Sequence, residues 1–260
     1  MGMKGHFLWY DLLTSDLEAA KSFYAKAVGW ETQRWGEEAN PYFMWMAGDT
    51  SVGGVMALPG ETEQEWGPSR WWAHVVVDDV DAAAARAEEL GGRIRTPPTD
   101  IPDVGRYAMI HDPQGAEISL FKPGQEAPAP DRMRTGGVGW HELHTSDYES
   151  AWKFYSELLG WRHTSSMDMG PAGTYFMFGH ADEPADVSLG GMFNPDAMTT
   201  PPFWLYYINV DDIDQAVARI RDAGGRIMSG PSEVPGGMVA SCMDPQGCRF
   251  AVFAPERQAG

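Results

Sequence analysis

Residues 139–147 of this chain read Gly-Trp-His-Glu-Leu-His-Thr-Ser-Asp, and residues 7–16 read Phe-Leu-Trp-Tyr-Asp-Leu-Leu-Thr-Ser-Asp. In both copies a short alternating segment, which is typical of a β-strand, leads into Thr-Ser-Asp. A glutamate follows the serine by three residues, at Glu18 and at Glu149, which is the pattern of a capping box with serine as the N-cap. The pattern predicts a strand followed by a helix at both places.

Each predicted helix has one apolar face and ends at a glycine, Gly29 in the first copy and Gly160 in the second. We expect both glycines to adopt the left-handed conformation that ends many helices. The apolar faces consist of Leu17, Ala20, Phe23, Tyr24 and Ala27 in the first copy and of Tyr148, Ala151, Phe154, Tyr155 and Leu158 in the second. The match continues further along the chain, because Asp-Pro-Gln-Gly occurs at residues 112–115 and again at 244–247. The chain is therefore a tandem duplication.

Strand and helix signals also occur twice within each half. In the first half, the opening strand and helix are followed by predicted strands at 42–46, 55–58 and 71–77, a helix at 80–90, a brief strand at 93–95, a loop at 97–103 and strands at 106–111 and 116–121. This order predicts two βαβββ modules per half, and so four in the chain. Residues 125–136, rich in proline, glycine and charge, are the predicted linker between an N-terminal domain at 1–124 and a C-terminal domain at 137–260.

The composition excludes several classes of protein. A formal net charge of -18 without a basic run argues against nucleic-acid binding, which depends on lysine and arginine displacing counterions from phosphates. No apolar stretch approaches the ~20 residues of a membrane-spanning helix, and residues 1–6 lack the apolar core of a signal peptide. We therefore expect a soluble, cytoplasmic protein that does not bind membranes, with Cys242 and Cys248 as free thiols rather than a disulfide.

Four features together resemble the vicinal oxygen chelate superfamily: the paired modules, the Thr-Ser-Asp helix with its Phe-Tyr and Gly-Trp, the Val-Asp-Asp helix start and the Asp-Pro-Gln-Gly hairpin. That superfamily includes glyoxalase I, bleomycin-resistance proteins and extradiol dioxygenases. The chain looks most like the two-domain glyoxalase-like proteins of bacteria. The resemblance implies an α+β fold, in which each half curls its two modules into a cup-shaped mixed sheet around a small-molecule cavity.

The resemblance also implies where a metal would bind. In metal-using members, histidine, glutamate or glutamine at four strand positions holds a divalent ion inside each cup. At these positions this chain has Trp9, Val55 or Met56, Trp72 and Ser119 in the first half, and Trp140, Met192 or Phe193, Leu205 and Ala251 in the second. A catalytic metal needs about three nitrogen, oxygen or thiolate ligands. We therefore expect no metal cofactor, and no chemistry of the glyoxalase I or dioxygenase type, in either cup.

Carboxylates and histidines lie on the same strands, two or four residues beyond these positions, and should face the same cups. The catalytic candidates are Asp11 with His74, and Glu142 with His144. Burial against tryptophan would desolvate the charged form of such a carboxylate and raise its pKa, which suits a general acid or base near neutral pH. The competing interpretation is structural: in it, Asp11 caps or bonds a neighbouring strand, and His144 lies at the strand end in solvent.

The same alternation gives a set of ligand-binding candidates. They are Trp9, Trp72, Glu117, Ser119, Trp140, Tyr207, Asn209 and Arg249. The aromatic members could form stacking walls for a planar ligand, because tryptophan and tyrosine supply a large apolar area and one polar group. They could equally fill the cups as core. A non-standard metal site built on Glu142 and His144 is a further alternative.

These observations lead to one hypothesis with two alternatives. The protein is expected to bind a small aromatic or carbonyl-bearing molecule without a metal and, if it is an enzyme, to act as a lyase, isomerase or hydrolase by proton transfer through Asp11 or Glu142. The first alternative is a drug-sequestering protein of the bleomycin-resistance type, and the second is a metal-dependent lyase, isomerase or dioxygenase. We expect a monomer whose partner is a small-molecule ligand, with a homodimer as the alternative.

Overall fold

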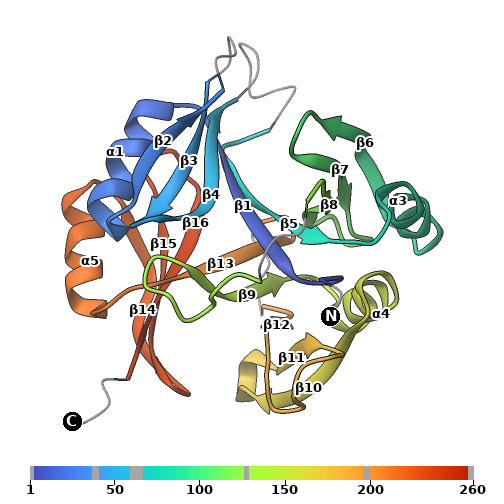
Figure 1. Ribbon diagram of the computed structural model, residues 1–260. Coiled ribbons are helices and arrows are strands. Elements are labelled where there is room, and N and C mark those ends of the chain that lie inside the picture. The colour runs from blue at the N-terminus through green and yellow to red at the C-terminus, as the bar shows by residue number, and fades with distance from the viewer. Residues whose placement is uncertain (1–2, 37–40, 59–66, 126–128, 196–199, 257–260) are drawn as a thin grey trace. The chain divides into compact units, whose positions relative to one another are not determined.

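The computed structural model describes residues 3–36, 41–58, 67–125, 129–195 and 200–256 (Figure 1). The first half contains β1 (Phe7–Thr14), α1 (Leu17–Val28), β2 (Glu31–Trp35), β3 (Tyr42–Ala47), β4 (Thr50–Ala57), β5 (Arg70–Val76), α3 (Val80–Glu89), β6 (Arg93–Ile101), β7 (Gly105–His111) and β8 (Glu117–Pro123). The second half contains β9 (Val138–His144), α4 (Tyr148–Leu159), β10 (Trp161–Asp168), the 3-10 turn η1 (Gly170–Ala172), β11 (Thr174–His180), β12 (Gly190–Phe193), β13 (Phe203–Asn209), α5 (Ile213–Asp222), β14 (Arg226–Val234), β15 (Gly237–Met243) and β16 (Arg249–Pro255). The predicted βαβββ order is therefore present four times.

Each half forms one eight-stranded mixed sheet. The strand order is β2-β3-β4-β1-β5-β8-β7-β6 in the first half and β10-β11-β12-β9-β13-β16-β15-β14 in the second. The strand that opens a module pairs in parallel with the strand that closes it, as β1 does with β4 and β9 with β12, whereas the hairpins between them are antiparallel. The predicted α+β class with mixed sheets is confirmed.

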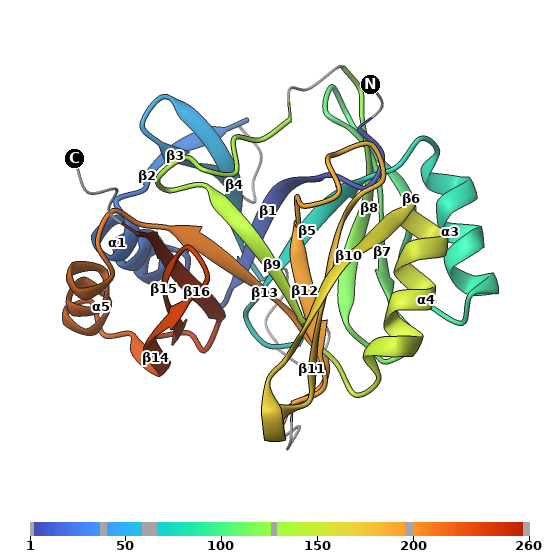
Figure 2. The same ribbon diagram turned by 90° about the horizontal axis from the view of Figure 1, so that it is seen from below.

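The chain packs as two compact units, and each unit contains one module from each half. Unit 1 comprises Met1–Leu8, Trp72–Pro130 and His141–Leu205, and unit 2 comprises Trp9–Trp71, Asp131–Trp140 and Tyr206–Gly260. Within unit 1, α3 lies beside α4; within unit 2, α1 lies beside α5 (Figures 1 and 2). The predicted domain bounds, 1–124 and 137–260 with a linker at 125–136, stay a prediction.

The helix that follows each Thr-Ser-Asp begins one residue later than the capping-box pattern predicted. The N-cap of α1 is Asp16, whose side chain accepts from the backbone N–H of Ala19, and the N-cap of α4 is Asp147, whose side chain accepts from Ser150. Serine as the N-cap was therefore wrong. Aspartate reaches the same N–H with an ionised oxygen, which also interacts favourably with the positive end of the helix dipole. The predicted left-handed glycines at both helix ends are confirmed.

This cap assignment predicts different costs for two neighbouring substitutions. Asp147→Ala removes an ionised acceptor from the first turn of α4 and is expected to lower the free energy of unfolding by about 1 kcal/mol. Ser146→Ala removes a side chain that is exposed and does not cap, and it should cost clearly less. Urea unfolding of both variants checks the assignment. If both variants lose the same free energy of unfolding, or if Ser146→Ala loses more, serine is the N-cap instead.

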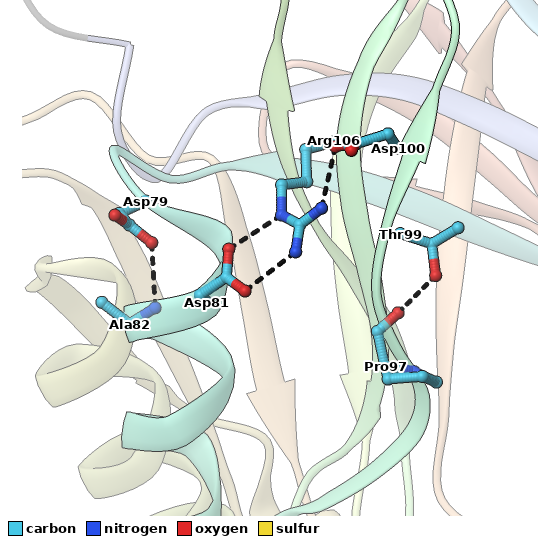
Figure 3. Close-up of polar contacts among 7 residues, drawn as sticks. All are labelled: Asp79, Asp81, Ala82, Pro97, Thr99, Asp100 and Arg106. Atoms are coloured by element: carbon cyan, nitrogen blue, oxygen red, sulfur yellow. Dashed lines mark hydrogen bonds and ion pairs between the residues drawn. The ribbon is translucent and has the colours of Figure 1, made fainter.

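Residues 97–103 do not form the predicted loop, because β6 continues as far as Ile101. The strand tolerates its two prolines at register shifts, between Ile94 and Thr96 and between Thr96 and Thr99, where ladder pairing is interrupted. Figure 3 shows the hydroxyl of Thr99 donating to the carbonyl of Pro97, at 2.7 Å. The predicted loop at 97–103 was therefore wrong, because a bulged strand at the edge of the sheet accommodates the two prolines.

Arg106 on β7 holds this extended strand and α3 together. Its guanidinium donates two hydrogen bonds to Asp81 in the first turn of α3, both at 2.8 Å, and one to Asp100 on β6, also at 2.8 Å (Figure 3). These bonds lower the pKa of the Asp81 carboxyl. Because both carboxylates are exposed and Arg106 is partly exposed, water screens the charges, and the contribution to stability is small.

A buried Trp-Tyr-Asp chain fixes the packing inside unit 1. The indole N–H of Trp204 donates to the hydroxyl of Tyr155 at 3.1 Å, and this hydroxyl donates to Oδ2 of Asp112 at 3.0 Å. The other oxygen of Asp112 accepts three backbone N–H groups of its own Asp-Pro-Gln-Gly turn. The Phe-Tyr motif of the second half is thereby joined to the turn of the first half.

Unit 2 contains the same chain with the halves exchanged. The indole N–H of Trp71 donates to the hydroxyl of Tyr24 at 2.9 Å, and this hydroxyl donates to Oδ2 of Asp244 at 3.1 Å. Phe23 also packs edge-on against Phe250, with ring centroids 5.9 Å apart. The duplicated motifs therefore serve contacts between modules of different halves, which sequence periodicity could not indicate.

Both cysteines are buried free thiols, as predicted. Burial raises the pKa of the Cys242 thiol to about 12 and raises that of Cys248 as well, so both thiols stay protonated at neutral pH. A water-soluble disulfide reagent at pH 8 is expected to modify neither thiol in the folded protein and both in denaturant. No reaction in denaturant would indicate a disulfide.

Candidate functional site

The third module contains a carboxylate, an imidazole and a phenol that are bonded in sequence. The Nε2 atom of His144 lies 2.7 Å from Oε1 of Glu142, and the hydroxyl of Tyr175 donates to Oε2 of Glu142 at 2.8 Å. Glu142 and His144 come from β9, two residues apart, and Tyr175 comes from β11. We call these three residues the Glu142 site. The predicted pair of Glu142 and His144 is thus in contact.

The carboxylate of Glu142 decides which ring nitrogen of His144 carries the hydrogen. An ionised carboxylate only accepts hydrogen bonds, so the Nε2 atom of His144 carries a hydrogen and donates it. In the neutral ring, Nδ1 is then the atom with the lone pair, and within the described residues no hydrogen bond to it is seen. The ring stacks on Phe203, with centroids 4.5 Å apart, and meets Phe193 edge-on at 4.7 Å. A fifth of the His144 side chain is solvent-accessible (20%), so the site is reachable.

The first module has a matching cluster with a different composition. Oδ1 of Asp11 accepts from the hydroxyl of Tyr42 at 2.7 Å and from the indole N–H of Trp9 at 3.1 Å. The indole N–H of Trp9 also lies 2.7 Å from the hydroxyl of Tyr42, so the three groups form a closed triangle. Leu13, buried, stands where the second half has His144. The structural interpretation expected Asp11 to bond a neighbouring strand, but these partners lie on β1 itself and on β3, which β4 separates from β1.

The two tyrosines were missed by the sequence analysis. Tyr42 and Tyr175 are at equivalent places, near the start of the strand that precedes the Gly-Gly pairs at 53–54 and 190–191. An aligned comparison of the two halves would have revealed them as a repeated polar residue on an otherwise apolar strand.

His74 lies in the second module between two polar side chains. The indole N–H of Trp72 donates to its Nε2 at 3.2 Å, and its Nδ1 lies 2.9 Å from the hydroxyl oxygen of Ser119. Because an indole only donates, Nε2 must be the acceptor, and in the neutral ring Nδ1 carries the hydrogen and donates it to Ser119. The nitrogen that faces Ser119 therefore has no lone pair with which to take a proton from the serine. All three predicted residues are brought together, but both nitrogens of His74 are occupied.

The remaining candidates have other surroundings. Glu117 forms a partly buried ion pair with Arg95, with N and O 2.5 Å apart. The side-chain amide of Asn209 donates to the backbone carbonyls of Arg132 at 2.7 Å and Arg134 at 3.1 Å, and so anchors the linker. The side chains of Trp140, Tyr207 and Arg249 are half-buried.

Two further histidines, which were not among the site candidates, are buried. His141 is 1% exposed, contacts the carbonyl of Leu189 through Nδ1 at 2.8 Å and stacks on Phe7 at 3.7 Å. His180 is 2% exposed and stacks on His6, with centroids 3.5 Å apart. Side chains along β9 alternate between its two faces, as expected. Both faces are covered, however, because His141 on one face and Glu142 on the other are buried.

The donor set does not fit the metal of the metal-using members. At the four expected positions, Trp9 and Trp72 use their indole N–H groups to donate hydrogen bonds, and an indole offers no lone pair to a metal. Glu142 and His144 supply two donors, one fewer than the three protein ligands of an ordinary catalytic zinc site. Within residues 3–36, 41–58, 67–125, 129–195 and 200–256, no three His, Cys, Asp or Glu side chains are grouped to hold a metal.

Comparison of the sequence with models of known protein families identifies the family of this chain. The chain belongs to the Glyoxalase/Bleomycin resistance protein/Dioxygenase superfamily, whose model matches residues 5–120 and 137–252. The resemblance inferred from the motifs is thus confirmed, including the tandem layout. Within the described residues, no helix is long and apolar enough to cross a membrane.

Particular relatives cover almost the whole chain. The "Putative glyoxylase CFP32" of Mycobacterium tuberculosis is 33% identical over 258 residues, which are 96% of this chain and 95% of that protein. The anthracycline biosynthesis protein DauV of Streptomyces sp. is 27% identical over 256 residues, 94% of this chain and 91% of that protein.

Solved structures share the fold at low identity. The Mn(II)-bound glyoxalase of Novosphingobium aromaticivorans matches with a TM-score of 0.66 and 16% identity, over 98% of this chain and 83% of that one. The 2,2',3-trihydroxybiphenyl 1,2-dioxygenase of Sphingomonas wittichii also has a TM-score of 0.66, with 14% identity, over 96% of this chain and 90% of that one. At such identities the likeness concerns the fold alone.

Proposed function

We propose that this protein binds a small aromatic, carbonyl-bearing molecule and transfers a proton at the Glu142 site without a metal. The observation that carries the proposal is the contact of His144 with Glu142, at 2.7 Å, in a site that keeps partial access to solvent. We assign the predicted role of base to His144 rather than Glu142, because its side chain is the more accessible of the two, 20% against 12%, and the carboxylate is engaged by one hydrogen bond on each oxygen.

The chemistry follows from the orientation of the imidazole. Glu142 accepts the hydrogen on Nε2, so the lone pair on Nδ1 can take a proton from an acidic C–H or O–H of a bound molecule. The imidazolium that forms then lies against a carboxylate, which stabilises its charge. The proton returns from Nδ1 to another atom of the same molecule or to its leaving group, which gives isomerase or lyase chemistry.

Two observations support an aromatic ligand with a carbonyl group. Phe193 and Phe203 place ring surfaces directly beside His144, and aromatic faces favour stacking with a planar molecule. A carbonyl acidifies a neighbouring C–H enough for a histidine to remove it. The name of DauV refers to anthracyclines, which are fused aromatic molecules with carbonyl groups.

Proton exchange tests the proposal without knowledge of the natural substrate. A panel of aryl ketones with an acidic C–H beside the carbonyl is incubated with the metal-free protein in D₂O, and loss of the C–H signal is followed by NMR. We expect catalysed exchange with some members of the panel, unchanged by a chelator. Binding detected by thermal shift without any exchange would support drug sequestration instead. Activity only after addition of a divalent metal would support the metal-dependent alternative.

The sequestering alternative is favoured by one specific feature of the first half. Oδ1 of Asp11 accepts from Trp9 and Tyr42, and Leu13 stands where the second half has His144, so that position does not supply an imidazole base. A ligand held there would remain unchanged.

We further propose that the protein is a monomer, because four modules in one chain can complete both sheets without a second copy. A cytoplasmic location is part of the same proposal.

A further inference from the structure

Tyr175 reaches Glu142 across an intervening strand. In the sheet, β12 lies between β11, which carries Tyr175, and β9, which carries Glu142. The residue of β12 opposite Glu142 is Gly191. A β-carbon at Gly191 would collide with the ring of Tyr175, including Cε1, Cζ and the hydroxyl oxygen. The phenol therefore reaches the carboxylate only because this residue is glycine.

The first half repeats this arrangement. Gly54 on β4 lies opposite Asp11, and a β-carbon there would collide with the hydroxyl of Tyr42 and approach Oδ1 of Asp11 to 2.7 Å. The duplication thus preserves a Gly-Tyr-carboxylate unit in two places. In the second copy, the other oxygen of the carboxylate also contacts the imidazole of His144, whereas the first copy has Leu13 at the corresponding position.

We infer that Tyr175 is a positioning residue for the Glu142 site, and that Gly191 is required for its placement. This inference rests on the proposed role of His144. A carboxylate held only by His144 could rotate about its terminal torsion, which is broad and poorly fixed. The hydrogen bond to Oε2 holds the carboxylate plane, so Oε1 keeps facing Nε2 of His144. The consequence is a single tautomer of His144, with its lone pair on Nδ1.

The test is the tautomer of His144, measured by the ¹⁵N chemical shifts of its ring in the full-length protein at neutral or mildly alkaline pH. His144→Asn identifies its signals among the seven histidines. In the wild type, we expect Nε2 to be protonated and Nδ1 to be unprotonated. In Tyr175→Phe and in Gly191→Ala, we expect the minor tautomer to rise to a share comparable with the major one.

The first half supplies matched controls. Tyr42→Phe and Gly54→Ala remove the corresponding contact from the Asp11 cluster and should leave the His144 tautomer unchanged, although they lower stability similarly. Thermal unfolding confirms that each variant is folded. If Tyr175→Phe and Gly191→Ala both keep the wild-type tautomer, the positioning role is overturned while the proposed function stands. If the wild-type ring is protonated at Nδ1 instead, the proposed function and this inference fall together.

Discussion

Replacing His144 with asparagine is expected to lower catalysed proton exchange by about 10²- to 10⁴-fold, the usual contribution of a general base. Asparagine is smaller and remains polar, so the partly exposed site should tolerate it without loss of the fold. The physical reason is specific: Nδ1 of His144 is the atom at this site that combines a lone pair with accessibility. Exchange of an aryl ketone proton, followed by NMR at equal protein concentration, measures the loss.

Glu142→Gln should have an intermediate effect. The glutamine keeps an oxygen that can accept from Nε2 of His144, but it removes the negative charge that stabilises the imidazolium. The maximal rate should therefore fall more than the affinity for the ketone. If Glu142→Gln abolishes exchange while His144→Asn retains it, the base is the carboxylate, as the sequence analysis first suggested.

The matched control is Asp11→Asn in the first half. Leu13 stands at the position that corresponds to His144, and Oδ1 of Asp11 accepts from Trp9 and Tyr42. We expect this variant to keep the wild-type exchange rate, within about twofold, and to lose some stability. A loss of activity as large as that of His144→Asn would show that the first half contributes to the chemistry.

Asp112→Ala is expected to cause the largest loss of stability, about 3–5 kcal/mol. Asp112 is 1% exposed, and its removal would leave three backbone N–H groups and the hydroxyl of Tyr155 without their acceptor in a buried place. Unsatisfied buried donors cost about 1–3 kcal/mol each, and partial relaxation reduces the sum. Urea unfolding, analysed with a fixed slope, measures the change.

Asp112→Asn serves as the conservative control, because its side-chain oxygen can still accept the three backbone N–H groups. Burial raises the pKa of the Asp112 carboxyl, although its four hydrogen bonds oppose the shift. Because the folded pKa lies above the unfolded one, the aspartate binds its proton more tightly in the folded state. Its contribution to stability therefore declines as pH rises from about 4. Relative to Asp112→Asn, the wild type should lose stability over that pH range. A difference that grows in favour of the wild type would contradict the raised pKa.

Much of the fold could be predicted because it depends on local patterns. Alternation in residues 7–14, the spacing of Phe23 and Tyr24, and the glycines at 29 and 160 each specify strand, helix or helix end through a few neighbouring residues. The repeat then extended every local prediction to the other half. Errors arose where two local signals competed, as at the Asp16 cap and the prolines of β6.

The candidate site was predictable only along single strands. Period-two alternation placed Glu142 beside His144, and Trp72 beside His74, because residues two apart share a face. The same rule cannot say which atom of a side chain meets which partner, so it could not assign the base to His144 rather than Glu142.

The sequence by itself determined the duplication, the module order, the family and the pairing of Glu142 with His144. Only the tertiary structure decided that Tyr175 crosses over Gly191 to Glu142, that His74 has both nitrogens occupied, and that Tyr155 of one half bonds Asp112 of the other. The physical reason is distance along the chain. Periodicity describes residues a few positions apart. The contacts of Tyr175 with Glu142, of Tyr155 with Asp112 and of His74 with Ser119 join residues 33, 43 and 45 positions apart, which meet only through packing and strand pairing.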